Sequence, residues 1–439
     1  MEKSLTIKIK KWGINGEGIG YIDRKPIFVQ GVLPDELVEV EIEKEFDKYY
    51  KGKLIQVIEE SPRRRHAICP IWKECGGCSL MHVQYKEQCK MKEQSLKETL
   101  IKYAGYKKRI NPFMKNTNPL GYRNACKLPF GYADGKIMTG MYERESNHFI
   151  GMEHCIVHSK VLETTRKQIV EICQKHKCKV YDKRLESGFQ TLVCKEFNGN
   201  IQVIFVTGKN TLSDEFIDDI LDIEPVTSIW QSIKVKDSID VFGDTMIHIA
   251  GDRNLTLEMH DMKFNILPKS FFQLNTEQAD KLYTYVESIL PESKTVIEAY
   301  SGIGAISLYI KDKAQSIIGI ESIKDAVDNA NENAAINHAD HVHFICGDAA
   351  KECEKIVKKK KVDTLIVDPP RSGLDENMKE TILNSKIRNI IYISCNPSTL
   401  SKDLDKLQKR YNILSVQPID MFSQTQHVET VVLLTKVQN

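Results

Sequence analysis

One cysteine near the end of the 439-residue chain stands where a nucleophile is useful, in the motif Ser394-Cys395-Asn396-Pro397. The apolar run 389–393 before it predicts a buried strand, and Asn396-Pro397 predicts the start of a helix. A thiol at the carboxyl end of such a strand lies at the edge of the sheet where α/β proteins bind ligands. The N-terminus of a helix favours the thiolate there. Against the alternative of a buried structural cysteine, we interpret Cys395 as a nucleophile.

Glycine and acid residues follow three further predicted strands. The run 295–299 leads into Tyr300-Ser301-Gly302-Ile303-Gly304, and the next two runs end at Glu321 and Asp348. The glycines let the backbone approach a ligand closely, and Glu321 is placed to accept hydrogen bonds from ribose hydroxyls. A dinucleotide site would need a third glycine, where the chain has Ser307. The pattern therefore predicts a site for S-adenosylmethionine, formed by Gly302, Gly304, Glu321 and Asp348.

The fourth predicted strand, 364–367, ends in Asp368-Pro369-Pro370-Arg371. An Asp-Pro-Pro motif at this place positions a planar amide or amine of the substrate beside the methyl donor. By itself the motif also allows an amino-methyltransferase. The thiol of Cys395, one strand away, favours covalent attack on a substrate ring instead. Loss of activity in Cys395→Ala is expected for the covalent enzyme, and retained activity for the amino-methyltransferase.

Together, these motifs resemble those of the S-adenosylmethionine-dependent RNA uracil-5-methyltransferases, in the family's order along the chain. The resemblance is carried by Phe271-Phe272-Gln273-Leu274-Asn275, the glycine turn after Glu298, Asp368-Pro369-Pro370-Arg371-Ser372-Gly373, Ser394-Cys395-Asn396-Pro397 and His427-Val428-Glu429-Thr430-Val431. It implies that Cys395 is the nucleophile and Glu429 the general base. It also implies that Phe271 stacks near the target base. The residues that it implies for the donor and uracil pocket are Gln273, Tyr300, Glu321 and Asp368.

These residue types suit methylation at C5 of uracil, which is a poor nucleophile. A thiolate that adds to C6 turns the ring into an enolate, whose C5 can take the methyl group. A base must then remove the C5 proton so that the thiol leaves, and Glu429 is suited to this step. Asp368 and Arg371 are expected to hold the uracil edge and to stabilise the enolate oxygen. The target base must leave its stack to enter the pocket.

A second group of cysteines has the spacing of metal ligands. It comprises Cys69, Cys75, Cys78 and Cys155. From spacing alone zinc competes with an iron–sulfur cluster, because several histidines lie nearby. The resemblance, here to the ribosomal-RNA-type members of the family, implies that the four thiolates hold a [4Fe–4S] cluster. The remaining cysteines are interpreted as structural thiols: Cys89, Cys126, Cys173, Cys178, Cys194, Cys346 and Cys353.

Charge is distributed unevenly along the chain. Its 62 Lys and Arg against 60 Asp and Glu leave a net charge of only +2. Between Lys48 and Arg109, however, 15 Lys or Arg stand against 6 Asp or Glu. This concentration beside the cysteine group indicates a surface for a polyanion such as RNA, with solvated helix faces as the alternative. Candidate phosphate contacts are Lys11, Arg24, Arg63, Arg64 and Arg65.

The sequence also excludes some classes of protein. No apolar run approaches the roughly 20 residues of a membrane helix, so no membrane partner is expected. The N-terminus lacks the apolar core of a secretion signal. We therefore expect a cytoplasmic protein whose thiols are reduced rather than paired in disulfides. We also expect it to be a monomer.

Three segments must position the residues that carry the chemistry. Residues 1–60 alternate apolar and polar residues between glycines, which predicts a small β-barrel that resembles a TRAM domain, an RNA-binding module. Residues 61–265 are predicted to form a central α+β domain with the iron–sulfur site and RNA contacts. In residues 266–439, apolar strand runs alternate with helical patterns, which is typical of the α/β, Rossmann-like domain of class I methyltransferases. Its last strand is predicted to pair antiparallel.

The target RNA stays open at this point. The resemblance favours 23S ribosomal RNA through the cysteine group and the barrel, and transfer RNA is the alternative. A non-catalytic iron–sulfur RNA-binding protein is a third interpretation, which absence of methyl transfer with Cys395 and Glu429 intact would support. Tyr122-Arg123-Asn124 also resembles a family motif, but the sequence predicts no role for it.

Overall fold

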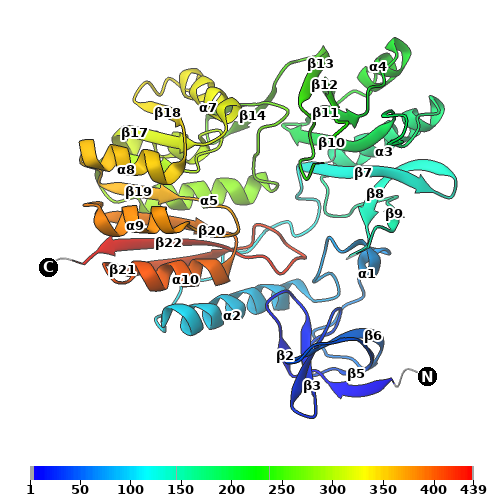
Figure 1. The fold of residues 1–439 in the computed structure, drawn as a ribbon, viewed down its shortest axis with the longest axis horizontal. Helices are drawn as coiled ribbons and strands as arrows, with labels where there is room; N and C mark the ends of the chain where they lie inside the picture. Colours follow the sequence, from blue (N-terminus) through cyan, green and yellow to red (C-terminus); the bar gives the residue numbers. More distant parts are fainter. Residues whose placement is uncertain (1–3, 145, 237, 438–439) are drawn as a thin grey trace.

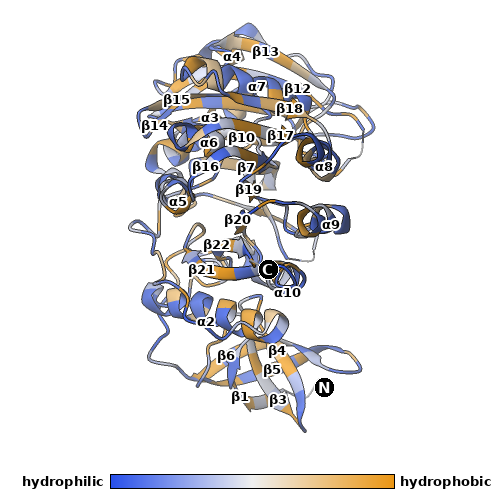
Figure 2. Ribbon diagram, turned by 90° about the vertical axis from the view of Figure 1, so that its left-hand side faces the viewer, coloured by the Kyte–Doolittle hydropathy of each residue, from blue (hydrophilic) through white to orange (hydrophobic). Residues whose placement is uncertain are grey.

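The computed structural model describes residues 4–144, 146–236 and 238–437. Figure 1 shows a small N-terminal barrel in blue, a central sheet in cyan and green, and a C-terminal sheet with its helices in light green to red. The long helix α2 (Tyr85–Ala104) lies between the barrel and the C-terminal sheet in both ribbon views (Figures 1 and 2). No helix in the described ranges is long and apolar enough to cross a membrane.

Six short strands form the N-terminal sheet, in the order β1-β5-β6-β4-β3-β2. Their bounds are β1 Leu5–Lys8, β2 Lys11–Trp12, β3 Gly18–Ile22, β4 Lys25–Val29, β5 Leu37–Glu45 and β6 Tyr50–Glu59. The apolar residues of the alternating pattern meet in a core of isoleucines and valines. All pairs are antiparallel except β4 with β6. The β-structure predicted for this segment is confirmed.

The central domain is built on a seven-stranded sheet, in the order β13-β12-β11-β10-β7-β8-β9. Its strands are β7 Ala125–Ala133, β8 Lys136–Tyr142, β9 Phe149–Gly151, β10 Phe189–Phe197, β11 Asn200–Thr207, β12 Val226–Ile233 and β13 Thr245–Gly251. Helices α3 (Lys160–Lys175) and α4 (Asp214–Leu221) pack on one face, around Phe189 and Phe205. The other face carries a separate apolar cluster with Trp230 and Met246. Both of these residues line the large cavity described below.

The C-terminal sheet has the order β18-β17-β16-β19-β20-β22-β21. Its strands are β16 Ser293–Ala299, β17 Ala314–Glu321, β18 Val342–Cys346, β19 Thr364–Val367, β20 Asn389–Ser394, β21 Tyr411–Ile419 and β22 Glu429–Lys436. Helices α5 Thr276–Ile289, α6 Ala305–Tyr309, α7 Lys324–Ile336, α8 Ala349–Lys359, α9 Glu376–Asn384 and α10 Pro397–Leu407 accompany them. The first five strands pair parallel, and β22 pairs antiparallel with β20, as predicted. This is a doubly wound α/β sheet.

Packing divides the chain differently from the composition. Helix α2 falls within the predicted central segment, yet its Leu96 and Leu100 belong to the apolar core of the C-terminal sheet. The hairpin of β14 (Leu255–Met259) and β15 (Met262–Ile266) likewise packs its apolar side chains into the C-terminal domain. Helix α2 and all of the hairpin except its last residue, Ile266, precede the predicted boundary, so the C-terminal domain includes segments from outside it. Apolar periodicity predicts that a helix is buried on one side, but not against which sheet.

Candidate active site

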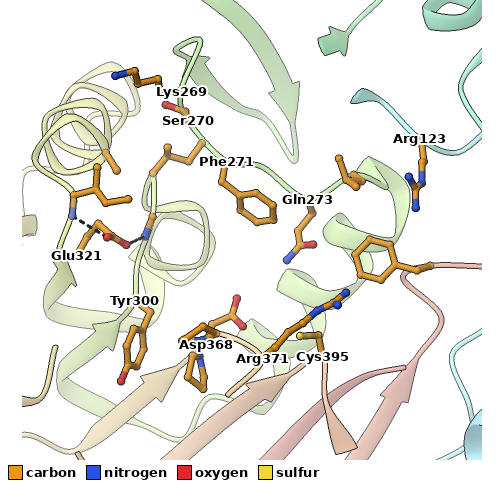
Figure 3. Close-up of a pocket in the computed structure, with 18 of the residues that line it drawn as sticks. Arg123, Lys269, Ser270, Phe271, Gln273, Tyr300, Glu321, Asp368, Arg371 and Cys395 are labelled. Atoms are coloured by element: carbon orange, nitrogen blue, oxygen red, sulfur yellow. Dashed lines mark hydrogen bonds between the residues drawn. The ribbon is translucent and has the colours of Figure 1, made fainter. Parts of the chain in front are cut away.

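A cavity of about 1170 Å³ lies at the carboxyl edge of the C-terminal sheet. The order of the strands reverses between β16 and β19, which is where doubly wound sheets bind their ligands. Because β22 runs antiparallel to β20, its first residue arrives at the same edge as the last residues of the parallel strands. The predicted site residues that line the cavity are Phe271, Gln273, Tyr300, Gly302, Glu321, Asp368, Arg371, Cys395 and Glu429 (Figure 3).

The glycine turn after β16 forms one end of the cavity. Tyr300 and Gly302 both have positive φ, +66° and +54°, so the chain turns sharply at the end of the strand. The Glu321 carboxylate accepts hydrogen bonds from the backbone N–H of Gly302 at 3.1 Å and of Ile323 at 3.0 Å. These bonds fix the acid beside the turn, at the rim of the cavity. A rigid acid next to closely approachable backbone fits the ribose and amino-acid parts of S-adenosylmethionine.

Two residues predicted for the donor site lie outside the lining of this cavity. Gly304 caps the N-terminus of α6 at φ +83°, and a Cβ there would lie 2.3 Å from the ring of Phe344. This glycine is therefore required by packing between turn and strand. Asp348 is exposed and caps α8, where its carboxylate accepts from the Lys351 N–H at 3.0 Å. A capping role accounts for an acid at this position without a ligand.

Two buried carboxyl groups face the centre of the cavity. Burial raises the pKa of Asp368 to about 7. Burial, and secondly the charge of Asp368, hold the pKa of Glu429 well above its usual range, while Arg371 opposes the shift. Glu429 is only 3% exposed. Both carboxyls hold a proton more tightly than exposed ones, and that of Asp368 titrates near neutral pH, which suits acid–base catalysis.

The Cys395 thiol lies beside Arg371 in this centre (Figure 3). The helix predicted after it begins at Pro397, with Asn396 as its N-cap. Burial nevertheless raises the pKa of the thiol to about 11, and Glu429 adds to the rise while Arg371 lowers it. The helix N-terminus therefore does not make the thiolate the resting form, and a nearby base must take the proton.

His427 lines the cavity next to Arg371. Its Nε2 lies 3.4 Å from a guanidinium nitrogen of Arg371. Burial, and secondly Arg371, lower the pKa of His427 to about 4, so the imidazole is neutral at neutral pH. Nothing in the sequence beyond its place in the His-Val-Glu-Thr motif distinguishes this residue.

The loop with Phe271 and Gln273 is held by the central domain. Phe271 is 66% exposed and projects into the cavity (Figure 3). The ammonium group of Lys195 donates to the carbonyls of Leu267 at 2.9 Å and Ser270 at 2.7 Å. The amide of Asn124 donates to the Gln273 carbonyl at 2.9 Å. These bonds fix both ends of the loop that presents an aromatic ring.

The loop 420–428, which leads into Glu429, is held by helix α2. Lys92 and Asp420 form an ion pair of 2.5 Å in which both side chains are buried. Lys92 also donates to the Phe422 carbonyl at 2.9 Å. The amide of Gln88 donates to the side chain of Gln424 at 2.9 Å, and the Gln424 N–H donates back to Gln88 at 3.0 Å. Glu429 is thus positioned from outside the sheet.

The motif Tyr122-Arg123-Asn124 connects these two loops, a role that the sequence did not predict. The Tyr122 hydroxyl donates to the Ser423 carbonyl at 2.9 Å, and Asn124 holds the loop of Gln273. Between them, Arg123 lines the cavity (Figure 3). Its Nε is buried without a hydrogen-bond partner among the described residues. The resemblance marked the motif, but only the fold shows what it contacts.

The four cysteines predicted as metal ligands share one neighbourhood. Burial raises the pKa of Cys78 to about 12, Arg123 lowers it, and the thiols of Cys155, Cys75 and Cys69 raise it further, so all four lie within electrostatic reach. Cys69, Cys78 and Cys155 also border one apolar cluster. Within the described ranges, no three His, Cys, Asp or Glu side chains are arranged to hold a metal ion. An all-thiol donor set fits the soft iron of an iron–sulfur cluster, and zinc as well.

Comparisons with known proteins agree with this site. Residues 84–437 match the family model tRNA (uracil-5-)-methyltransferase, and residues 3–55 match the TRAM domain. A chain from Bacillus cereus named as an uncharacterized RNA methyltransferase is 34% identical over 445 residues, covering 99% of this chain and 97% of the relative. A relative of the same name from Clostridium tetani is 34% identical, covering 99% and 98%. The solved structure of Pyrococcus abyssi tRNA (uracil-54, C5)-methyltransferase with S-adenosyl-L-homocysteine superposes with a TM-score of 0.80 at 26% identity, covering 98% of this chain and 100% of that one.

The fold and the cavity therefore define an S-adenosylmethionine-dependent enzyme that acts on RNA. More narrowly, the chain belongs to the tRNA (uracil-5-)-methyltransferase family, with an N-terminal TRAM domain. It transfers a methyl group to C5 of a uridine in RNA.

Proposed function

We propose that the methylated RNA is 23S ribosomal RNA and that the reaction proceeds through a covalent bond between Cys395 and C6 of the uracil. The observation that carries the reaction is the meeting of Cys395, Arg371, Asp368 and Glu429 around one cavity. The four neighbouring cysteines support the ribosomal target, because their pattern resembles that of the ribosomal-RNA-type members of the family.

In the first step, the Cys395 sulfur attacks C6. The thiol is protonated at neutral pH, so it gives its proton to the ionised carboxylate of Asp368, and Glu429 is left for the later proton transfer. The S–C6 bond forms, the electron pair of C5=C6 moves toward O4, and Arg371 stabilises the resulting negative charge. The carbonyl oxygen of the Asp368 carboxyl, which now carries the thiol proton, accepts a hydrogen bond from the N3–H of the ring.

S-Adenosylmethionine, when bound at the glycine turn beside Glu321, supplies a methyl group that is open to attack by C5. The ionised carboxylate of Glu429 then removes the C5 proton, the electron pair restores C5=C6, and the thiolate of Cys395 leaves and takes its proton back from Asp368. Burial suits Glu429 to this step, because a raised pKa makes it a stronger base than an exposed carboxylate. Phe271 stacks on the base that has left its helix, and Gln273 contacts its edge.

The cysteine group is proposed to hold the [4Fe–4S] cluster, with Cys69, Cys75, Cys78 and Cys155 as ligands. Such a cluster would supply a cross-link between the segments 69–78 and 155, not a step of the reaction. Backbone of Arg123 pairs with this second segment, through its N–H to the Val157 carbonyl at 2.8 Å. The cysteine segment near Cys155 is therefore bonded to the motif Tyr122-Arg123-Asn124, which holds the loops of Gln273 and Ser423.

The test is to map 5-methyluridine in total RNA from cells with and without the gene. Loss of the nucleoside from 23S ribosomal RNA, restored by the intact gene but not by Cys395→Ala, is the expected result. Loss from transfer RNA alone would overturn the ribosomal target. Purified protein should also form a stable adduct with RNA in which that uridine is replaced by 5-fluorouridine, because the base then has no C5 proton to remove. An adduct that persists in Cys395→Ala would overturn the nucleophile.

Transfer RNA is the second candidate, and specific observations favour it. The matching family model bears the name of a transfer-RNA enzyme, and the superposed Pyrococcus abyssi protein is described as methylating uracil 54 of transfer RNA. The same mapping experiment decides between the two RNAs.

A further inference from the structure

The cavity extends beyond the parts that the reaction uses. Besides the donor end and the reacting centre, it is lined by Arg144, Trp230, Asp244 and Met246 of the central domain, next to Gly76-Gly77 of the cysteine segment. Its volume of about 1170 Å³ exceeds the roughly 300–1,000 Å³ of a site for one small ligand. A part of the cavity thus remains for another portion of the substrate.

The floor of this third part is apolar. Trp230 and Met246 belong to one cluster on the face of the central sheet away from α3 and α4. Strand pairing explains why they meet: Trp230 is opposite His248 and Met246 is opposite Ser232 on β12 and β13, so all four side chains share a face. The indole Nε1 has no hydrogen-bond partner within the described part of the chain. Trp230 is 7% exposed, with His248 and Arg253 against its ring, so only a small part of the indole is open to the cavity beside the less buried Met246. A nucleobase packs on such an apolar floor of ring and thioether.

The rim of this part carries one cation and one anion. Arg144 is exposed, and its guanidinium donates a hydrogen bond to the Gly76 carbonyl at 2.8 Å. A guanidinium has five N–H groups, so it can also contact a phosphate. The Asp244 carboxylate is 84% exposed and lies 3.1 Å from Lys236. A carboxylate repels phosphate, but it accepts a hydrogen bond from the exocyclic amine of cytosine, adenine or guanine.

We propose that Trp230, Met246, Asp244 and Arg144 form a subsite for a nucleotide that flanks the target uridine, and that Asp244 selects a base with an exocyclic amine over uracil. The inference rests on the proposed function, since a uridine that turns into the reacting centre carries its strand past the mouth of the cavity. Trp230 and Met246 receive the face of the neighbouring base, Asp244 accepts from its edge, and Arg144 neutralises the phosphate.

The test uses transcripts of the RNA fragment that contains the mapped 5-methyluridine. Each position on either side of the target, up to the third, is given all four bases in turn, and kcat/KM for methyl transfer is measured with the full-length protein. At one position, wild type should prefer adenine, cytosine or guanine to uracil by about tenfold. In Asp244→Asn this preference should fall below about twofold, because an amide can donate to the uracil carbonyl.

Asp240→Asn is the matched control, because Asp240 is exposed on the same β12–β13 connection and lies outside the lining of the cavity. It should keep the wild-type preference. Trp230→Phe retains a ring for folding and should raise KM for every transcript about threefold while the affinity for S-adenosylmethionine stays unchanged. Equal rates for all transcripts with wild type, or an unchanged preference in Asp244→Asn, would overturn the subsite. Failure of the proposed function would show differently, as the absence of any gene-dependent 5-methyluridine in 23S ribosomal RNA.

Discussion

Two regions beside the active site differ in whether their buried ionisable groups have a partner of opposite charge. At the sheet edge, burial raises the pKa of Asp368 to about 7 and that of Glu298 to about 8. Behind the loop 420–428, by contrast, Lys92 and Asp420 form a buried ion pair, and Asp420 accepts further hydrogen bonds from Tyr85 and Ser423. The first region keeps carboxyls poised for proton transfer at a cost in stability. In the second region the buried charges are paired, and this pairing holds the loop that leads into Glu429.

The largest effects are expected from the reacting groups themselves. Cys395→Ala should abolish both methyl transfer and adduct formation, because no other group can attack C6. Glu429→Gln should slow turnover by about 10² to 10⁴-fold. The two variants should differ in one respect: Glu429→Gln should accumulate the covalent complex with ordinary RNA, since the C5 proton stays in place. Denaturing gel electrophoresis of protein with labelled RNA measures this, and a Glu429→Gln protein free of adduct would remove Glu429 from the proton transfer.

Lys92→Met should lower the free energy of unfolding, because it removes the buried ion pair of the second region. The change leaves the Asp420 carboxylate buried without its cation, which costs about 3 kcal/mol in the free energy of unfolding. Lys90→Met on the same helix removes an exposed charge paired with Glu87 and should cost less than about 0.5 kcal/mol. Urea denaturation of both variants gives the comparison. Equal losses would mean that the buried pair adds nothing specific.

The sequence predicts much of the sheet edge but not the buried ion pair behind the loop 420–428. Cys395 and Asp368 follow strand ends, so apolar runs followed by short motifs were enough to predict that they share one edge. Glu429 begins its strand, and only the family resemblance implied a role for it. Asp348 and Gly304 follow the same pattern, but their local roles in a helix cap and a tight turn explain them. Asp420, in contrast, meets a lysine 328 positions away. No periodicity encodes such a contact, because it depends on where α2 packs.

A change of intermediate size should follow from neutralising Asp368. Its pKa in the folded protein, about 7, lies above the ordinary value of 3.8, so the folded state binds this proton more tightly. Wild type should therefore lose stability as the pH rises from about 4 through 7. Asp368→Asn lacks this loss and should be more stable than wild type above pH 7, by on the order of 2 kcal/mol.

Thermal and urea unfolding between pH 4 and 8 measures this difference. Asp325→Asn serves as the control, because Asp325 also lines the cavity but is exposed. The free energy of unfolding of Asp325→Asn should stay within about 0.5 kcal/mol of wild type, as is usual for an exposed side chain. A flat difference for Asp368→Asn would show that the carboxyl is ionised in the folded protein at low pH, and that the sheet edge does not store the cost ascribed to it.

The smallest effect is expected for Tyr122→Phe, which tests whether Tyr122 positions the loop before Glu429 or supports binding of S-adenosylmethionine. Tyr122→Phe keeps the ring that packs against Met81 and Val157 but removes the hydrogen bond to the Ser423 carbonyl, at a cost of about 1 kcal/mol. Since Ser423 lies in the loop that leads to Glu429, kcat should fall a few-fold while the affinity for S-adenosylmethionine, bound at the other end of the cavity, stays unchanged. Calorimetry and single-turnover methyl transfer distinguish these quantities, with Tyr21→Phe on the exposed face of the barrel as the control. Weaker donor binding with unchanged kcat would mean that the motif supports the sheet edge rather than the loop.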